Sequence, residues 1–127
     1  MKKMILLFSH QLTENQKEDA HQNWDIESFI ALPEKLQKLW SNIDPDLESV
    51  SDYLDPVRTF LESTAEEGDV ILIQGDFGAC YNLVEHTKSS NMLPVYATTR
   101  RLIEEYTENG KSIKKSIFEH RRFRRYA

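Results

Sequence analysis

Cysteine, glycine and long apolar runs are scarce in this sequence of 127 residues, and each scarcity excludes a class of protein. The single cysteine, Cys80, excludes an intrachain disulfide and a zinc site built from cysteines, and it suits a reducing cytosol. Four glycines and four prolines exclude a collagen-like chain. The apolar run at residues 4–8 is too short for a membrane span or for the apolar region of a signal peptide. We therefore expect a cytoplasmic protein without a membrane segment.

Basic residues are also scarce in most of the chain. Residues 1–99 contain 7 Lys or Arg and 17 Asp or Glu, a net charge of −10, whereas residues 100–127 contain 9 and 4, a net charge of +5. The 39% hydrophobic content is that of an ordinary globular protein and excludes wholly disordered and mucin-like chains. An acidic body argues against long duplex nucleic acid, whose binding needs an extended basic surface. A small anionic ligand or a short RNA fits this charge distribution better.

Apolar segments and helical patterns alternate along the first hundred residues. A capping box from Thr13 to Gln16 predicts the start of a helix, and Pro56 predicts a kink or a restart after Asp55. Strands are expected at residues 4–8, 28–32, 70–73 and 91–97, and helices at 13–22, twice within 34–66 and over about ten residues after Gly78. This order favours a Rossmann-like, mostly parallel α/β sheet with helices on both faces, in one domain over residues 1–127.

Asn109-Gly110 is the strongest turn signal in the sequence, because a type I′ turn needs positive φ at both of its central residues. A two-residue turn there brings opposite charges and apolar side chains into register, each pair adding about 0.2–1 kcal/mol. The expected pairs are Glu108 with Lys111, Glu105 with Lys114, Glu104 with Lys115, Tyr106 with Ile113 and Leu102 with Ile117, followed by Arg100 with Glu119 and Thr99 with His120. The sequence therefore predicts an antiparallel hairpin over residues 100–123.

Polar clusters follow the expected strands, and parallel α/β sheets bind ligands beyond the carboxyl ends of their strands. The clusters are Ser9-His10-Gln11, Gln74-Gly75-Asp76-Phe77-Gly78, Thr98-Thr99-Arg100 and the tail after Phe118. The second cluster can bring backbone N–H groups close to a phosphate, and it equally suits a tight turn that binds nothing. It is neither a Walker A loop nor a full dinucleotide fingerprint, which disfavours an enzyme with a nucleotide cofactor.

Each remaining candidate has a functional and a structural interpretation. Ser9 and His10 can supply a hydroxyl and an imidazole for proton transfer, or they can cap a turn and lie in a loop. The four histidines lack the spacing of metal ligands, so we expect neither a metal nor a cofactor. Cys80 lies in an expected helix, which favours a packing role. The arginines of residues 121–125 suit phosphates and bases, or they belong to a frayed terminus.

Five blocks, in order and nearly from end to end, resemble a small family of Csx-type CRISPR ancillary proteins of type III systems. The blocks are Phe8-Ser9-His10-Gln11-Leu12-Thr13, Leu39-Trp40-Ser41-Asn42-Ile43, Ile73-Gln74-Gly75-Asp76-Phe77-Gly78, Tyr96-Ala97-Thr98-Thr99-Arg100 and His120-Arg121-Arg122-Phe123-Arg124. Members of that family are described as ring nucleases. They are similar in fold to CARF domains, the Rossmann-like domains that sense cyclic oligoadenylates.

The resemblance implies a homodimeric, metal-independent ring nuclease that cleaves cyclic tetra-adenylate by attack of a ribose 2′-OH and so ends an antiviral signal. Ser9, His10 and Arg100 would act in catalysis, with His10 as the general base. Ligand contacts would come from Gln11, Gln74, Gly75, Asp76, Phe77, Gly78, Thr98, Thr99, His120, Arg122 and Arg124. Two alternatives remain: a protein that sequesters the cyclic oligoadenylate without cutting it, and an RNA-binding accessory protein that uses the arginine tail.

Overall fold

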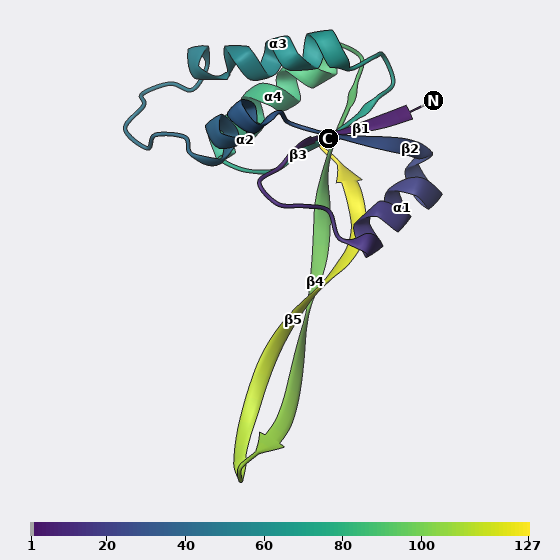
Figure 1. The fold of residues 1–127 in the computed structure, drawn as a ribbon, viewed down its shortest axis with the longest axis vertical. Coiled ribbons are helices and arrows are strands. Elements are labelled where there is room, and N and C mark those ends of the chain that lie inside the picture. Colours follow the sequence, from purple (N-terminus) through teal and green to yellow (C-terminus); the bar gives the residue numbers. More distant parts are fainter. Residues whose placement is uncertain (1) are drawn as a thin grey trace.

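The computed structural model describes residues 2–127, which form a mixed α/β fold with an extended hairpin (Figure 1). The strands are β1 (Lys2–Leu7), β2 (Ile26–Ala31), β3 (Val70–Ile73), β4 (Leu93–Glu108) and β5 (Lys111–Arg125). The helices are α1 (Glu14–Trp24), α2 (Glu34–Ser41), the 3₁₀ turn η1 (Asp52–Leu54), α3 (Asp55–Thr64) and α4 (Phe77–Ser89). In this part of the chain, no helix is long and apolar enough to cross a bilayer.

The five strands form one sheet in the order β2-β1-β3-β4-β5. β1 pairs in parallel with β2 and with β3, and β3 pairs in parallel with β4. β5 pairs with β4 in antiparallel orientation. The chain moves from β1 to β2 and then returns past β1 to β3, so its direction across the sheet reverses between β1 and β3. Open α/β sheets bind ligands beside such a reversal, at the carboxyl ends of the strands.

Helices cover both faces of the sheet, and each face has its own apolar core (Figure 1). On one face, α2, α3 and α4 pack on β1 and β3 through side chains such as Trp40, Leu61 and Leu83. On the other face, α1 lies over a core that includes Val95 and Phe123. The alternation of side chains along a strand explains both cores, because successive residues of β1 and β3 point to opposite faces. The prediction of an α/β fold is confirmed.

Several helices and strands begin or end at other residues than predicted. β1 ends at Leu7 and not at residue 8, and β2 begins at Ile26 and not at residue 28. The restart at Pro56 is confirmed, since α3 begins at Asp55 and a proline in the first turn loses no helical hydrogen bond. The prediction that a strand ends near Ala97 was wrong. β4 continues for 16 residues into the hairpin, so Thr98, Thr99 and Arg100 lie within a strand.

The hairpin has the predicted register at every pair from Thr99–His120 to Glu108–Lys111. Asn109 and Gly110 both have positive φ, 52° and 75°, as a type I′ turn requires. β5 then continues to Arg125, beyond the expected end at residue 123, so the arginine tail is a paired strand and not a frayed terminus. The part from Arg100 to Glu119, which we call the arm, projects away from the body of the molecule (Figure 1).

Candidate functional site

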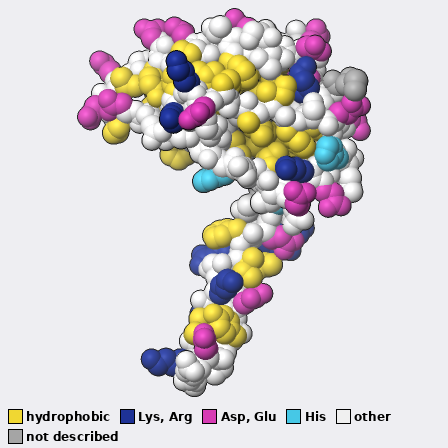
Figure 2. Space-filling view, in the orientation of Figure 1, with side chains coloured by type: hydrophobic (Ala, Val, Ile, Leu, Met, Phe, Trp, Pro, Cys, Tyr) yellow, Lys and Arg dark blue, Asp and Glu magenta, His cyan; other side chains and the backbone are white. Residues whose placement is uncertain are grey.

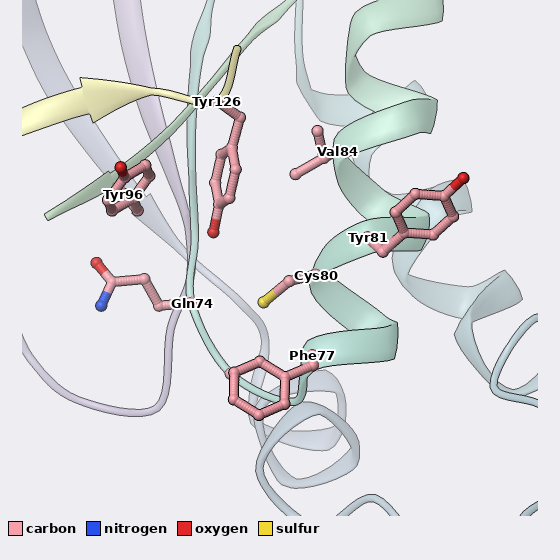
Figure 3. A pocket seen from close by; sticks show the side chains of 8 residues that line it. Gln74, Phe77, Cys80, Tyr81, Val84, Tyr96 and Tyr126 are labelled. Carbon is pink, nitrogen blue, oxygen red and sulfur yellow. The ribbon is translucent and has the colours of Figure 1, made fainter.

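Two hollows of similar size lie at the carboxyl ends of the parallel strands. The first, the aromatic hollow, has a volume of about 560 Å³ and is lined by Gln74, Gly75, Phe77, Cys80, Tyr81, Val84, Tyr96 and Tyr126 (Figure 3). The second, the polar hollow, has a volume of about 460 Å³ and is lined by Leu6, Phe8, Ser9, His10, Gln11, Leu12, Lys17, Phe29, Ala31, Leu32 and Gln37. The predicted clusters after β1 and β3 therefore face two hollows.

Gln74 connects the strands beside these hollows. Its backbone N–H donates to the carbonyl of Leu7 at 3.0 Å, so the loops that follow β1 and β3 begin side by side. Its side-chain Oε1 accepts from the N–H of Ala97 on β4 at 2.7 Å. Its carbonyl accepts from the indole Nε1 of Trp40 at 3.0 Å. The two hollows thus lie on either side of the junction between β1 and β3.

The loop from Gln74 to Gly78 is held by local packing and by a helix cap. A Cβ on Gly75 would lie 2.9 Å from Nε1 of Trp40, so a glycine is required where the loop passes over the indole. Asp76 is the N-cap of α4, and its Oδ2 accepts from the N–H of Ala79 at 3.0 Å. Phe77 is the first residue of α4, and 94% of its surface is exposed. Asp76 therefore holds the loop, and Phe77 is free to contact a ligand.

Cys80 and Tyr126 face each other across the aromatic hollow (Figure 3). Burial raises the pKa of the Cys80 thiol, so the thiol stays neutral and is a poor nucleophile. Burial also raises the pKa of Tyr126 to about 12. The hydroxyl of Tyr126 donates to the carbonyl of Ile73 at 2.6 Å, which places its ring as a wall of the hollow. The aromatic hollow offers flat apolar surfaces and no strong acid or base.

The polar hollow contains the groups suited to proton transfer. Ser9 and His10 are exposed there. The ring of His10 contacts the ring of Phe8 edge-on, with the centroids 5.4 Å apart. Ser9 Oγ accepts from Ser41 Oγ at 2.9 Å. Ser9 is therefore tied to α2, whereas His10 faces solvent beside the hollow.

One basic side chain of β5, that of Arg124, contacts a residue of the aromatic hollow. Arg124 donates to the hydroxyl of Tyr96 at 2.9 Å, and its guanidinium lies 5.5 Å from the centre of that ring. Arg122 is opposite Thr98, whose hydroxyl donates to the Arg122 carbonyl at 2.9 Å. Arg100 follows two residues after Thr98, on the same face of β4. Tyr96 thus holds one guanidinium beside the hollow, and Thr98 serves the pairing of the two strands.

Thr99 and His120 lie on the opposite face of the sheet, toward α1. His120 is half of a buried pair, with Nε2 2.7 Å from Oδ2 of Asp19. Thr99 and His120 line a separate hollow, together with Ile117, Phe118, Glu119 and residues at the start of α1. The structure therefore divides the candidate residues between two faces. The loop after β3, Thr98, Arg100, Arg122 and Arg124 do not share a face with Thr99 and His120. The polar hollow after β1, in contrast, is lined partly by residues of the core under α1, such as Phe8 and Phe29, and by Lys17 of α1.

The sequence patterns did not indicate Tyr81 or Tyr126 as residues of the site, and Tyr96 belonged only to one of the resembling sequence blocks. Tyr81 lies one helical turn after Phe77, a spacing that places both rings on one face of α4. That spacing could have identified Tyr81 as a neighbour of the loop. Tyr126 could not have been found, because its position depends on β5 returning along β4 as far as Val95.

The fold and these two hollows define an α/β protein with a candidate ligand site at the reversal point of its sheet. A model of the family described as "Uncharacterized protein MJ1673 family" matches residues 2–124. The chain is 48% identical over 126 residues to "Uncharacterized protein MJ1673" of Methanocaldococcus jannaschii, covering 99% of this chain and 98% of that relative. The chain therefore belongs to the MJ1673 family. No solved structure matches it.

Proposed function

We propose that the protein is a cytoplasmic, homodimeric ring nuclease with a Rossmann-like fold, which binds and cleaves cyclic tetra-adenylate. The observation that supports this best is the aromatic hollow, which lies at the carboxyl end of β3 beside Tyr96 of β4 and has a guanidinium bound to that tyrosine. Aromatic rings stack on nucleobases, and arginine binds phosphate. The resemblance to Csx-type proteins, carried by the same loops, supports the choice of ligand.

The aromatic hollow would hold an adenine. The rings of Phe77, Tyr96 and Tyr126 offer faces for stacking, and all three line the hollow. The amide of Gln74, whose Oε1 is fixed by Ala97, can donate through Nε2 to a nitrogen of the base. Arg124 stands beside Tyr96, where it can bind the phosphate attached to the stacked nucleotide. The base and its phosphate would thus be recognised by different elements.

The polar hollow would supply the chemistry. In the proposed step, the ribose 2′-oxygen bonds to the adjacent phosphorus and the bond from phosphorus to the 5′-oxygen breaks. A 2′,3′-cyclic phosphate forms, and the 5′-oxygen takes up a proton from water and leaves as a hydroxyl. His10 would accept the 2′-OH proton, since an imidazole can exchange protons near neutral pH. Ser9 and Arg100 would contact the scissile phosphate. Holding the attack in line would be the main contribution of the remaining residues.

Incubation of the purified protein with cyclic tri-, tetra- and hexa-adenylate in EDTA tests this proposal. We expect linear products ending in 2′,3′-cyclic phosphate, formed fastest from the tetra-adenylate. An intact ring after prolonged incubation with excess enzyme would contradict the assignment as a nuclease.

Sequestration without cleavage is the second candidate. It is favoured by one observation: His10 and Ser9 line the polar hollow and none of the wall of the aromatic hollow. A protein that only binds the ring would need the aromatic hollow alone. Tight binding with complete recovery of the intact ring would decide for this candidate.

A further inference from the structure

The arm carries apolar side chains on a part of the molecule that has no core. Leu102, Tyr106, Ile113 and Ile117 form two directly opposed pairs, so all four lie on one face of the ribbon, which we call the apolar face of the arm. Figure 2 shows apolar side chains exposed along the arm among charged ones. An isolated two-stranded ribbon is marginally stable in water, so the arm would gain stability from a partner.

The apolar face begins on the side of the sheet that carries the aromatic hollow. Side chains two residues apart along a strand share a face, so Tyr96, Thr98, Arg100 and Leu102 form one row on β4. Tyr96 lines the aromatic hollow, and Leu102 begins the apolar face. The right-handed twist of the ribbon then turns the outer part of the arm away from its own body. A partner on the apolar face would therefore sit beside the candidate site.

A second exposed apolar patch lies on the rim of the aromatic hollow. Phe77 and Tyr81, one helical turn apart on α4, are 94% and 71% exposed. On the arm, Leu102 and Tyr106 of the apolar face are 39% and 45% exposed. Ile103 and Phe118 are also exposed, and they lie on the opposite face of the arm, away from the aromatic hollow. In a twofold dimer, the arm of each copy can pack on the rim of its partner. Two equivalent contacts then cover both arms and both rims.

We propose that the apolar face of the arm packs on the Phe77–Tyr81 rim of a second copy of this chain, so that each arm closes over its partner's aromatic hollow. The interface goes beyond the proposed function, which requires a dimer but does not say how it forms.

Charge favours a second copy as the occupant. The body, residues 1–99 and 120–127, carries a net charge of −6, so two bodies repel each other. The arm, residues 100–119, has five Lys or Arg (Arg100, Arg101, Lys111, Lys114, Lys115) and four Asp or Glu (Glu104, Glu105, Glu108, Glu119), a net charge of +1. Its Glu and Lys side chains face each other across the ribbon. The arm can therefore approach an acidic body without repulsion.

The size of the arm also suits this contact. With a rise of about 3.3 Å per residue, the nine residues from 100 to 108 span roughly 30 Å, about the width of a small domain. One face of such a ribbon covers roughly 300 Å². Two reciprocal arms, each burying that area on itself and on its partner, would bury roughly 1,200 Å², the lower bound for stable interfaces.

Sedimentation velocity of the full chain without ligand tests the proposal. We expect the wild-type protein to be a dimer, and the double variant Leu102→Glu/Tyr106→Glu to dissociate at least about 100-fold more readily. The variant Tyr81→Glu, on the opposite patch, should do the same. The matched control is Thr107→Glu, on the other face of the arm, which should remain a dimer. Circular dichroism of each variant shows whether the body is folded.

Mixing the two dissociated variants separates this interface from one in which arms pack on arms. A mixture of Leu102→Glu/Tyr106→Glu with Tyr81→Glu retains one intact arm and one intact rim, so heterodimers should form where neither variant alone dimerises. A monomeric wild type, a dimeric arm variant or a mixture without heterodimers would overturn the proposal. Because no ligand is present, these outcomes are independent of whether the protein cleaves cyclic oligoadenylates.

Discussion

The aromatic and polar hollows have similar volumes and adjoin the same junction between β1 and β3, but their linings differ. The aromatic hollow offers four rings, a neutral thiol and an oriented amide, which suit the binding of a flat base. The polar hollow offers an imidazole and a hydroxyl at the end of β1. Under the proposed function, binding and cleavage would be divided between neighbouring loops, and substitutions can test this division.

Loss of the imidazole should have the largest effect. We expect His10→Ala to lower the single-turnover rate of ring cleavage by about 10²–10⁴-fold, because a general base contributes this much to proton transfer. The dissociation constant of the ring should change little, since His10 lies outside the aromatic hollow. Rapid-quench kinetics and a binding titration of the same variant measure the two quantities. Equal losses in the cleavage rate and in the affinity would show that cleavage and binding are not divided between the two hollows.

Loss of a stacking ring should affect binding instead. We expect Tyr96→Ala to weaken binding of the ring by about 10- to 100-fold, because stacking on a base is worth about 1–3 kcal/mol. The variant also frees the Arg124 guanidinium that Tyr96 holds. Tyr96→Phe is the matched control, since it keeps the ring and removes only the hydroxyl. An unchanged affinity of Tyr96→Ala for the ring would contradict binding of the base in the aromatic hollow.

The loop between the hollows should be sensitive to an added methyl group at one glycine only. Gly75→Ala places a Cβ against the indole of Trp40, whose bond to the Gln74 carbonyl must then shift, and we expect a loss of about 1–3 kcal/mol in unfolding free energy. Gly78→Ala is the control. Its Cβ would lie 3.4 Å from Asp76 Oδ2, and alanine favours a helix over glycine by up to about 1 kcal/mol. Equal melting curves for both variants would contradict the packing described for the loop.

The smallest effect concerns the wall of the aromatic hollow at high pH. The pKa of Tyr126 is about 12 in the folded protein, above its ordinary value of 10.0, so folding favours the neutral phenol. Its contribution to stability is complete below pH 10 and is lost as the pH rises toward 12. Tyr126→Phe removes the bond to Ile73, which costs about 0.5–1.5 kcal/mol, and should flatten this alkaline decline. Chemical denaturation at several alkaline pH values compares the two proteins.

Local signals predicted most of the fold because local chemistry determines it. Thr13 and Gln16 form the capping box that their spacing predicts, and Asn109-Gly110 sets the register of the hairpin from Glu108–Lys111 back to Thr99–His120. The length of β4 was missed because Thr98, Thr99 and Arg100 are polar, and a polar run resembles the end of a strand. Only pairing with β5 stabilises it as a strand.

The candidate site was predicted in part. The loops after β1 and β3 were found because polar residues that follow apolar strands lie at a common edge. The position of Tyr126 and the separation of His120 from that edge were not predicted. Both depend on the return of β5 along β4, and on the register shift between Thr98 and Thr99 that leaves one extra residue in β5. Such contacts lie far apart in sequence and leave no periodic pattern.

In the proposed dimer, two copies of the site would hold one cyclic oligoadenylate. Calorimetric titration of the slowed variant His10→Ala with cyclic tetra-adenylate tests it most directly, because the ring survives the measurement. We predict saturable binding with one ring for every two chains, consistent with a twofold ligand on a twofold dimer. Absence of binding, or one ring for each chain, would contradict the account.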